Sequence, residues 1–412
     1  MNVLVLGGAG LQGKAAIYDL SKSFSVERIV CADQNPDALK PYLHLMDASK
    51  IFFAKVDASD TAALTSLMKG CVAGSSSTAS AFDVVIDVLP VRYLPNVCAA
   101  ALEAGVNVVN TMYGHQVPDW FHAKAVERGI AFLPEAGLDP GIDLVLCRYG
   151  CSQLDEVHEL HSMCGGIPEP AAIDNPLKYK ISWTWNGVLL SYKRPAVMMR
   201  DGEVITVDPK DQHAPGWVAT TIIPGVGKLE SILNGDAMEF AEQLGVARAL
   251  RNTTRSTLRW PGHSYLWKTF YDLGFLSDEP VPGLGGGVTP HEFMVHHLGP
   301  RLQYGPQERD MVVMRTIVGG VKGGEPARLT FDLVDSRDLA TGFMAMNRTV
   351  GFSVSICAQM LARGEIKGRG LLQAVRDIPP RRFLDELRKR GITITETMET
   401  GQAEGTTDSR RA

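Results

Sequence analysis

The first 33 residues constrain the fold more strongly than any other part of the sequence. An apolar run over residues 3–6 leads into the glycine-rich residues 7–13, and an amphipathic stretch follows. A second apolar run over residues 29–32 stops at Asp33. This succession predicts a buried strand, a tight turn, a helix packed on the strand, and a second strand that ends at an acid.

Three glycines in the turn, Gly8, Gly10 and Gly13, fit the pattern G-x-G-x-x-G. In that pattern the glycines allow a tight turn, close approach of the backbone to a diphosphate, and close packing of helix on sheet. The diphosphate would rest on the helix N-terminus, where unpaired N–H groups favour negative charge. Asp33 lies about 20 residues beyond the last glycine, where an acid accepts hydrogen bonds from a ribose 2′-OH and repels a 2′-phosphate. We therefore expect NAD as the cofactor rather than NADP.

Composition limits the other classes of protein. The chain has 412 residues, of which 45% are hydrophobic and 21% charged, and this is enough for two or three ordinary globular domains. A net charge of −5 disfavours nucleic acid or an anionic membrane surface as a partner. No apolar run reaches the roughly 18 residues of a membrane span, and the N-terminal residues are expected to form a strand rather than a signal peptide. The seven scattered cysteines include no CxxC pair and no zinc-type spacing, so we expect a cytoplasmic protein without a metal.

Short apolar strands alternate with helical stretches as far as about residue 140. This alternation predicts a parallel sheet with helices on both faces, and right-handed crossovers make it a doubly wound Rossmann sheet in an α/β protein. A third strand is expected to close at 55–57, and further strands are expected at 83–88, 106–109 and 130–133. The expected helices are 60–69, 94–104 and 117–128, and 74–78 is a polar loop.

The rhythm changes beyond residue 140, where longer strands with few helices indicate a second α/β domain on a mixed or antiparallel sheet. The expected strands lie near 156–164, 179–183, 203–207, 217–223, 311–319 and 328–334, and a long helix is expected near 344–363. The predicted organisation is an NAD-binding domain at 1–140 completed by 341–395, a substrate-binding and dimerisation domain at 141–340, and a disordered tail at 396–412.

Ligands of a doubly wound sheet bind beyond the carboxyl ends of its strands, so the loops there are the candidate site. The loop at 110–115 contains Tyr113 and His115, and the loop at 134–143 contains three acids. Asp139 in the second loop has an alternative role as the cap of the helix that follows Pro140. The residues expected to contact the cofactor are Gly8, Gly10, Leu11, Gln12, Gly13, Asp33, Asp57, Leu89 and Pro90.

A second cluster begins at Cys164, which two glycines follow, and continues with Lys178 and Lys180. The lysines could hold a substrate carboxylate or could be a solvated strand face, and Cys164 taken alone is more often a small buried hydrophobic residue. His115 and His263 could transfer protons, or they could form capping or core hydrogen bonds.

Several of these motifs together resemble the saccharopine dehydrogenase family. They are residues 135–143, 164–168, 175–183 and 341–352, and the likeness covers almost the whole chain to about residue 395. Within that family residues 257–263 are most similar to bacterial lysine 6-dehydrogenase, whereas the surroundings of Cys164 and Trp183 are shared with the glutamate-forming saccharopine reductases. The family usually has a histidine where this chain has Leu144.

The resemblance implies hydride transfer between a nicotinamide and a carbon that bears nitrogen, in a dimer, with Tyr113, Asp139 and Cys164 lining the substrate cleft. An amine with a pKa of about 10.4 must lose a proton before hydride can leave, and Asp139 is the expected base. Tyr113 would orient the amine, and Cys164 would shape the pocket. The expected substrate contacts are Glu135, Lys178, Lys180, Arg259 and His263, of which Arg259 suits a bidentate grip on a carboxylate.

The main expectation is an L-lysine 6-dehydrogenase or a related amino-acid dehydrogenase acting on a small amino-acid substrate. The alternative enzyme is a glutamate-forming saccharopine dehydrogenase or a related imine reductase. A third hypothesis, from another class, is a non-catalytic NAD-binding regulator.

Overall fold

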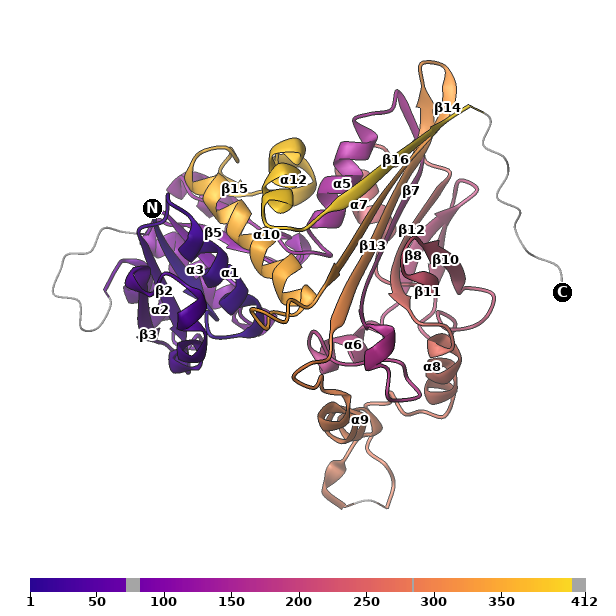
Figure 1. Cartoon of the computed structure of the whole chain (residues 1–412), viewed down its shortest axis with the longest axis horizontal. Coiled ribbons are helices and arrows are strands. Elements are labelled where there is room, and N and C mark those ends of the chain that lie inside the picture. The colour runs from indigo at the N-terminus through magenta and orange to yellow at the C-terminus, as the bar shows by residue number, and fades with distance from the viewer. Residues whose placement is uncertain (72–81, 284, 402–412) are drawn as a thin grey trace. The chain divides into compact units, whose positions relative to one another are not determined.

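The chain forms two compact units, shown in Figure 1. The computed structural model describes residues 1–71, 82–283 and 285–401. Unit 1 consists of Met1–Val145 and Ala340–Ile392, and unit 2 consists of Leu146–Leu339 and the residues from Thr393 on. The predicted domain limits at 140 and 341 lie close to these boundaries. The polar loop predicted at 74–78 lies outside the described residues.

Unit 1 is the predicted Rossmann fold. Its seven strands are all parallel, in the order β15-β6-β5-β4-β1-β2-β3, with β1 in the centre between β4 and β2. The strands are β1 (Asn2–Leu6), β2 (Arg28–Asp33), β3 (Ile51–Lys55), β4 (Val84–Asp87), β5 (Asn107–Asn110), β6 (Ala131–Leu133) and β15 (Gly370–Leu371). The helices are α1 (Leu11–Lys22), α2 (Thr61–Met68), α3 (Leu94–Ala104), α4 (Phe121–Arg128), α10 (Ala345–Ala362), α11 (Ala374–Asp377) and α12 (Pro380–Lys389), and α5 (Ile142–Cys151) crosses into unit 2.

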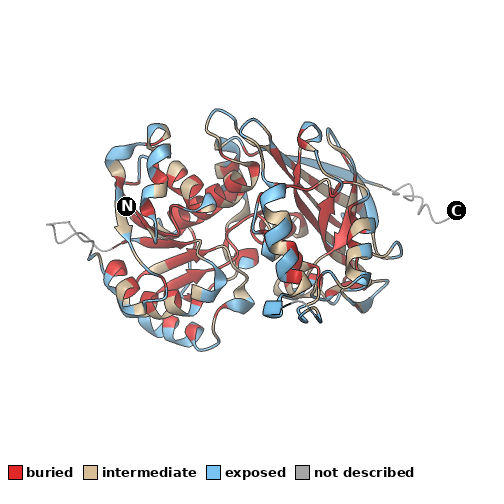
Figure 2. Ribbon diagram, turned by 90° about the horizontal axis from the view of Figure 1, so that it is seen from below, coloured by how far each residue is buried: buried red, intermediate tan, exposed pale blue. Residues whose placement is uncertain are grey.

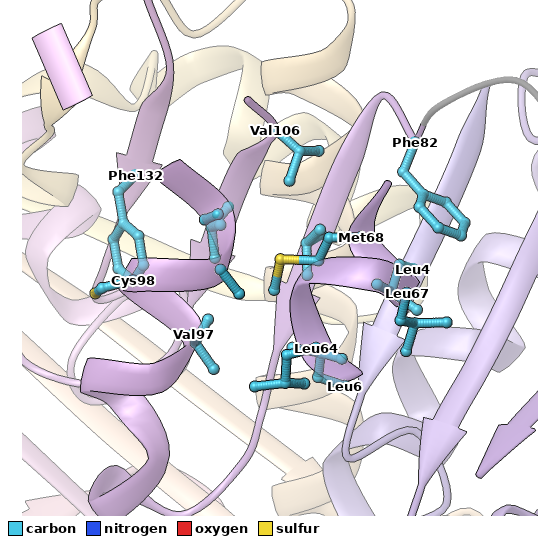
Figure 3. Packing of buried hydrophobic residues seen from close by; sticks show 14 of the residues in the cluster. Leu4, Leu6, Leu64, Leu67, Met68, Phe82, Val97, Cys98, Val106 and Phe132 are labelled. Carbon is cyan, nitrogen blue, oxygen red and sulfur yellow. The ribbon is translucent and has the colours of Figure 1, made fainter. Parts of the chain in front are cut away.

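The core of unit 1 forms where α2 and α3 cover one face of this sheet. Figure 3 shows Leu4 and Leu6 of β1 near Leu64 of α2 and Val97 of α3, and all of them are buried. Local signals fix the ends of these helices, because Asp60 Oδ1 accepts the Ala63 N–H at the start of α2, and α3 ends at Gly105 with a left-handed backbone. The apolar strands predicted from the sequence are therefore buried by the helices predicted between them.

The C-terminal segment completes unit 1, because α10 packs against α1 at Gly351. A Cβ at Gly351 would lie 2.6 Å from the Ala15 Cβ and 2.7 Å from the Gln12 carbonyl oxygen, so a larger residue would push the helices apart. The short strand β15 then pairs with β6 at the edge of the sheet. The long helix predicted at 344–363 is thus part of the dinucleotide-binding fold.

Unit 2 is built on a mixed sheet of nine strands. Seven follow the order β10-β11-β12-β7-β13-β14-β16, and β8 pairs with both β12 and β9. β7 and β12 are parallel, and the other pairs are antiparallel. Figure 2 shows the buried residues gathered along the strands. The strands are β7 (Glu156–Pro168), β8 (Ala196–Arg200), β9 (Glu203–Val207), β10 (Ala219–Ile223), β11 (Gly227–Leu233), β12 (Asn252–Arg259), β13 (Asp310–Lys322), β14 (Glu325–Ser336) and β16 (Ile394–Thr400). The helices are α6 (Trp185–Ser191), α7 (Ala237–Gln243), α8 (His263–Asp272) and α9 (Pro290–Leu298).

Four elements of unit 2 differ from the prediction. Residues 179–183 form no strand, because Tyr179 packs into an aromatic cluster and the Ile181 N–H donates to the Leu302 carbonyl. The strands β8, β11 and β12 were not expected. In β12 the buried side chains are mostly polar or charged, so hydrophobic alternation does not mark it as a strand.

The predicted disordered tail is also wrong in its first part. Residues 396–400 belong to β16, which pairs with β14 along its full length from Leu333 to Ala327. The segment is rich in threonine, a β-branched residue that favours strands, although its polar composition suggested disorder. Residues 402–412 lie outside the described part of the chain.

Candidate functional site

The turn after β1 requires its glycines. The N–H groups of Gly7 and Gly8 donate to the Ala32 carbonyl at 2.9 and 3.2 Å, which ties the turn to β2. A Cβ at Gly13 would lie 2.3 Å from the Gly7 carbonyl oxygen, and one at Gly8 would lie 2.9 Å from Cys31 Sγ. The turn can therefore be this tight only with glycine at these positions.

The start of α1 is open to an anion. Gly10 precedes the helix, no side chain of the described residues caps it, and both Gly10 and Leu11 are exposed. The Gln12 side chain accepts a hydrogen bond from Asn347 Nδ2 at 3.1 Å, which orients it beside this turn. Uncapped N–H groups of a first helical turn hold the diphosphate in dinucleotide-binding folds, so this cradle fits the predicted cofactor.

Asp33 ends β2 beside the same turn. Its Oδ2 accepts the Ala9 N–H at 3.2 Å and its Oδ1 accepts the Asn35 N–H at 3.0 Å, so the carboxylate is held in a fixed position. Lys14 is the cation that interacts with it, although burial has the larger effect on Lys14 and lowers its pKa. The carboxylate is half-buried, and its contact with a ribose stays a prediction.

Asp57 and Leu89 lie after β3 and β4 on the same edge of the sheet. Asp57 is exposed, and its Oδ1 accepts the N–H and the hydroxyl of Ser59, which lower the pKa of Asp57. A Cβ at Gly7 would lie 3.4 Å from Leu89 Cδ2, so Leu89 packs on the glycine turn, and its contact with the cofactor stays a prediction. Pro90, beside it, is exposed.

The loops after β5 and β6 are joined by Glu135. This buried acid has a positive φ of 59°, and its Oε1 accepts the Gly114 N–H at 2.9 Å. Tyr113, directly before Gly114, is half-buried and stacks on the His115 ring with centroids 5.3 Å apart. Glu135, which we predicted as a substrate contact, is thus the residue that fixes the Tyr113 loop.

The second half of the β6 loop is closed on itself. A Cβ at Gly141 would lie 2.1 Å from the Gly137 carbonyl oxygen, so only glycine fits there. Asp143 Oδ1 accepts the Gly141 N–H at 2.7 Å, and Asp143 is fully buried. Asp139, which lies between Gly137 and Gly141 in the sequence, is half-buried and more accessible than the other two acids.

In unit 2 a buried arginine lies near Cys164. Cys164 is on β7 and is buried, with Thr257 of β12 as its neighbour in the sheet, two residues from Arg259. Arg259 Nη1 donates to the Leu258 carbonyl at 2.8 Å, and the guanidinium lies 5.2 Å from the centre of the Tyr179 ring. Its Nε has no hydrogen-bond partner among the residues that the structure describes. A buried guanidinium with an unsatisfied N–H is suited to a ligand carboxylate.

The two lysines predicted to hold the substrate are engaged within unit 2. Lys180 is buried, and its Nζ lies 2.7 Å from Asp174 and 2.7 Å from Glu308. Burial opposes the charge of Lys180, but these two hydrogen bonds outweigh it and raise the Lys180 pKa. Lys178 Nζ donates to the Pro261 carbonyl at 2.8 Å. The alternation of the two lysines suggested a solvated face or a carboxylate site, whereas the structure uses them to fix loops.

His263 also has a structural partner on each ring nitrogen. Nδ1 lies 3.1 Å from the Leu177 carbonyl, which can only accept, so Nδ1 carries the proton. Nε2 then accepts the Tyr192 hydroxyl at 2.8 Å. Burial, and next the positive charge of Arg259, lower the His263 pKa well below its ordinary value. The structure therefore supports the alternative of core hydrogen bonding over a substrate contact.

Sequence reasoning missed the partners of these groups. Tyr179 and Tyr192 lie in the aromatic cluster that surrounds Arg259 and His263, together with Trp185. In unit 1 it assigned no role to Asp87, although an acid that ends an apolar strand is a signal of a buried polar contact. The sequence does not show the partner of Asp87, which lies on another strand.

Across the described ranges no group of three His, Cys, Asp or Glu side chains is placed to hold a metal ion. In the same ranges no helix has both the length and the apolar character that crossing a bilayer requires.

Comparison with known families decides the relationship of the chain. Residues 3–133 match the family model described as the saccharopine dehydrogenase NADP binding domain, and residues 137–392 match the saccharopine dehydrogenase C-terminal domain. The chain belongs to the saccharopine dehydrogenase family. The family's two models divide the chain between β6 and α5, close to the boundary of the two units.

Individual relatives agree with this family. The chain is 30% identical over 352 residues to the mitochondrial alpha-aminoadipic semialdehyde synthase of Mus musculus, covering 70% of this chain and 38% of that protein. It is 29% identical over 356 residues to the saccharopine dehydrogenase [NADP(+), L-glutamate-forming] of Saccharomyces cerevisiae, covering 70% of this chain and 78% of the yeast protein. The solved structure of apo saccharopine dehydrogenase (L-Glu forming) from that yeast superposes with a TM-score of 0.79 at 25% identity, over 97% of this chain and 99% of that chain. The chain spans about two-fifths of the length of the mouse relative.

Proposed function

We propose that this chain is an NAD(P)-linked oxidoreductase that oxidises the secondary amine of saccharopine and releases glutamate. The observation that carries the proposal is the match of both halves to one family, together with the yeast relative named as the glutamate-forming saccharopine dehydrogenase. The main expectation from the sequence, a lysine 6-dehydrogenase, depended on residues 257–263. The relatives favour the alternative.

The proposed reaction needs one base and one hydride acceptor. Asp139 would take the proton from the secondary ammonium, because its carboxylate is the more accessible acid of the β6 loop. The bound dinucleotide would accept hydride from the carbon that joins the nitrogen on the side away from the glutamate unit. Water would then add to the resulting C=N bond, and cleavage of the C–N bond would leave an aldehyde and glutamate. Tyr113 would orient the nitrogen, and Cys164 would shape the pocket.

Arg259 is the residue we propose for a substrate carboxylate. Its guanidinium is buried and lies over the Tyr179 ring, and its Nε has no hydrogen-bond partner in the part of the chain that the structure describes. An arginine is charged at every accessible pH, and its planar fork matches a carboxylate in a bidentate contact. Lys178 and Lys180 would contribute by holding the loop beside it.

We further propose NAD rather than NADP as the preferred cofactor. The family model and the yeast relative are named for NADP, so the comparisons support a nicotinamide dinucleotide of either kind. Asp33 supports NAD, because its carboxylate is fixed by two backbone N–H groups and would repel a 2′-phosphate.

Absorbance at 340 nm tests these proposals together. Purified protein is mixed with saccharopine or lysine, each with NAD or NADP, and the expected result is NADH formation from saccharopine with NAD. Asp139→Asn should lower kcat about 10²–10⁴-fold without changing the NADH dissociation constant. Turnover of lysine but not saccharopine would restore the lysine dehydrogenase hypothesis. NADH binding without turnover of either would favour the regulator.

A further inference from the structure

We propose that Asp87 and Asn110 form a positioning pair that holds the turn over the cofactor glycines in register with the turn that carries Tyr113. The two residues end the neighbouring strands β4 and β5 and lie opposite each other in the sheet. The inference depends on the proposed function only in that it names what the two turns would bind.

Three hydrogen bonds connect the turns through this pair. The Leu89 N–H donates to Asp87 Oδ1 at 3.1 Å. Asn110 Nδ2 donates to Asp87 Oδ2 at 2.5 Å, and Asn110 Oδ1 accepts the Met112 N–H. Each side chain therefore holds the backbone two residues further along its own turn and holds the other side chain at the same time.

Both turns reach the predicted site directly. A Cβ at Gly7 would lie 3.2 Å from the Val88 carbonyl oxygen, so the turn after β4 lies against the glycine turn. Met112 immediately precedes Tyr113, and its carbonyl accepts the Glu135 N–H at 2.9 Å, which extends the network to the β6 loop. A shift in the pair would thus move the cofactor wall and the Tyr113 loop together.

Burying the Asp87 carboxylate and the Asn110 amide costs desolvation free energy that apolar residues at these positions would not. Asp87 is 2% exposed and Asn110 is 1% exposed, and the three residues before Asp87 in β4 are all apolar and buried. Burial raises the Asp87 pKa to about 6, opposed by the hydrogen bonds from Leu89 and Asn110. Burial, and next the negative charge of Asp87, also raise the pKa of the Cys98 thiol of α3 to about 12. An apolar residue at position 87 would avoid this cost, so the hydrogen bonds to the turns are what the pair provides.

The donors and acceptors of this network are arranged in an order that an exchange of the two residues can test. A carboxylate at position 87 supplies two acceptors, and the Asn110 amide supplies one donor and one acceptor. In Asp87→Asn two amides face each other, and only two of the three hydrogen bonds can form at once. The lost bond is the one from the Leu89 N–H, the one from the Met112 N–H, or the one between the two side chains. The exchange Asp87→Asn with Asn110→Asp restores all three, because the amide at 87 accepts from Leu89 and donates to the carboxylate at 110, which accepts from Met112.

The experiment compares wild type, Asp87→Asn, Asn110→Asp and the double exchange, with Asp83→Asn as the control. Asp83 directly precedes β4, at the end of the strand away from the turns, and its Oδ2 accepts the Asn2 N–H at 2.6 Å, so it tests an Asp-to-Asn change remote from the turns. NADH affinity is measured by fluorescence, and kcat and KM by absorbance. A buried polar group that loses its hydrogen-bond partner costs about 1–3 kcal/mol. Each single exchange should therefore weaken NADH binding roughly tenfold and raise the KM for saccharopine roughly tenfold. The double exchange should return both to within about threefold of wild type.

A double exchange as impaired as the single ones, in variants that fold like wild type, would overturn the proposal. If the exchange variants do not fold, Asn110→Ala tests the proposal instead. Amide hydrogen exchange should then become faster at both Leu89 and Met112. Unchanged exchange at Leu89 would also refute the connection. If wild type binds NADH but does not oxidise saccharopine, the proposed function fails, and the affinity and exchange measurements still decide on the pair.

Discussion

Arg259→Met should lower substrate binding strongly and change the free energy of unfolding only slightly. Methionine fills a similar volume without charge. Arg259 is the last residue of β12, and its side chain is 7% exposed. If the guanidinium is there to bind a carboxylate, its removal should abolish most of the substrate binding and leave the fold nearly as stable as before.

The structure gives the sizes of the opposing terms. The variant loses the hydrogen bonds to the Leu258 carbonyl and to the Tyr192 side chain and the contact with the Tyr179 ring, at about 1 kcal/mol each. It also removes a buried cation, whose desolvation costs several kcal/mol. The free energy of unfolding should therefore change by no more than about 2 kcal/mol. Losing a bidentate contact with a carboxylate should lower kcat/KM by about 10²–10³-fold, mainly through KM.

Arg255→Met is the matched control. Arg255 lies four residues earlier on the same face of β12, is 5% exposed, and packs over the Phe240 ring at 4.6 Å. Its kcat/KM should stay within about threefold of wild type. Denaturant unfolding and steady-state kinetics are measured on both variants. An Arg259→Met protein with wild-type kcat/KM and a large loss of stability would show that the arginine serves the fold, and the reasoning would be wrong.

Three further predictions concern the cofactor and acid. Gly13→Ala should weaken NADH binding at least about tenfold, because its Cβ would lie 2.3 Å from a backbone oxygen, whereas Gly216→Ala, with open space around it, should bind normally by fluorescence. Asp33→Ser should raise kcat/KM for NADP relative to NAD by about tenfold or more, and an unchanged ratio would refute its role in selectivity. Burial lowers the His213 pKa to about 4, so the unfolded state binds the proton more readily below pH 6.5. His213 should therefore contribute a loss of about 3 kcal/mol in the free energy of unfolding between pH 6.5 and 4, and the loss measured by denaturant unfolding should be smaller by about that amount in His213→Gln.

The dinucleotide-binding half was predictable because its signals are local. Helix α3 was predicted with the limits Leu94 and Ala104 that the structure has, since apolar spacing and the following glycine mark both ends. Gly8, Gly10 and Gly13 identified the turn for the same reason. By contrast β12 was missed, because it buries Thr253, Arg255 and their neighbours instead of apolar residues. Its place beside β7 depends on contacts almost a hundred residues apart in the sequence.

The residue types of the candidate site were predictable from the sequence, but their hydrogen-bond and ion-pair partners were not. A lysine two residues from another lysine gives no indication that one pairs with Asp174 and Glu308. A histidine before a helix likewise does not reveal that Tyr192 occupies its Nε2. These pairings join segments that only the tertiary fold brings together, and a motif carries no information about them.

The order in which the chain is synthesised gives the C-terminal segment a special part in folding. Residues 340–392 supply α10 and the edge strand β15 to unit 1, and the residues after 392 supply β16 to unit 2. A nascent chain that has emerged only as far as residue 339 therefore lacks a strand of each sheet and leaves the Ala15 side of α1 without Gly351 against it. Neither half can reach its final form before the other has been translated, so both depend on completion of the same last stretch of polypeptide.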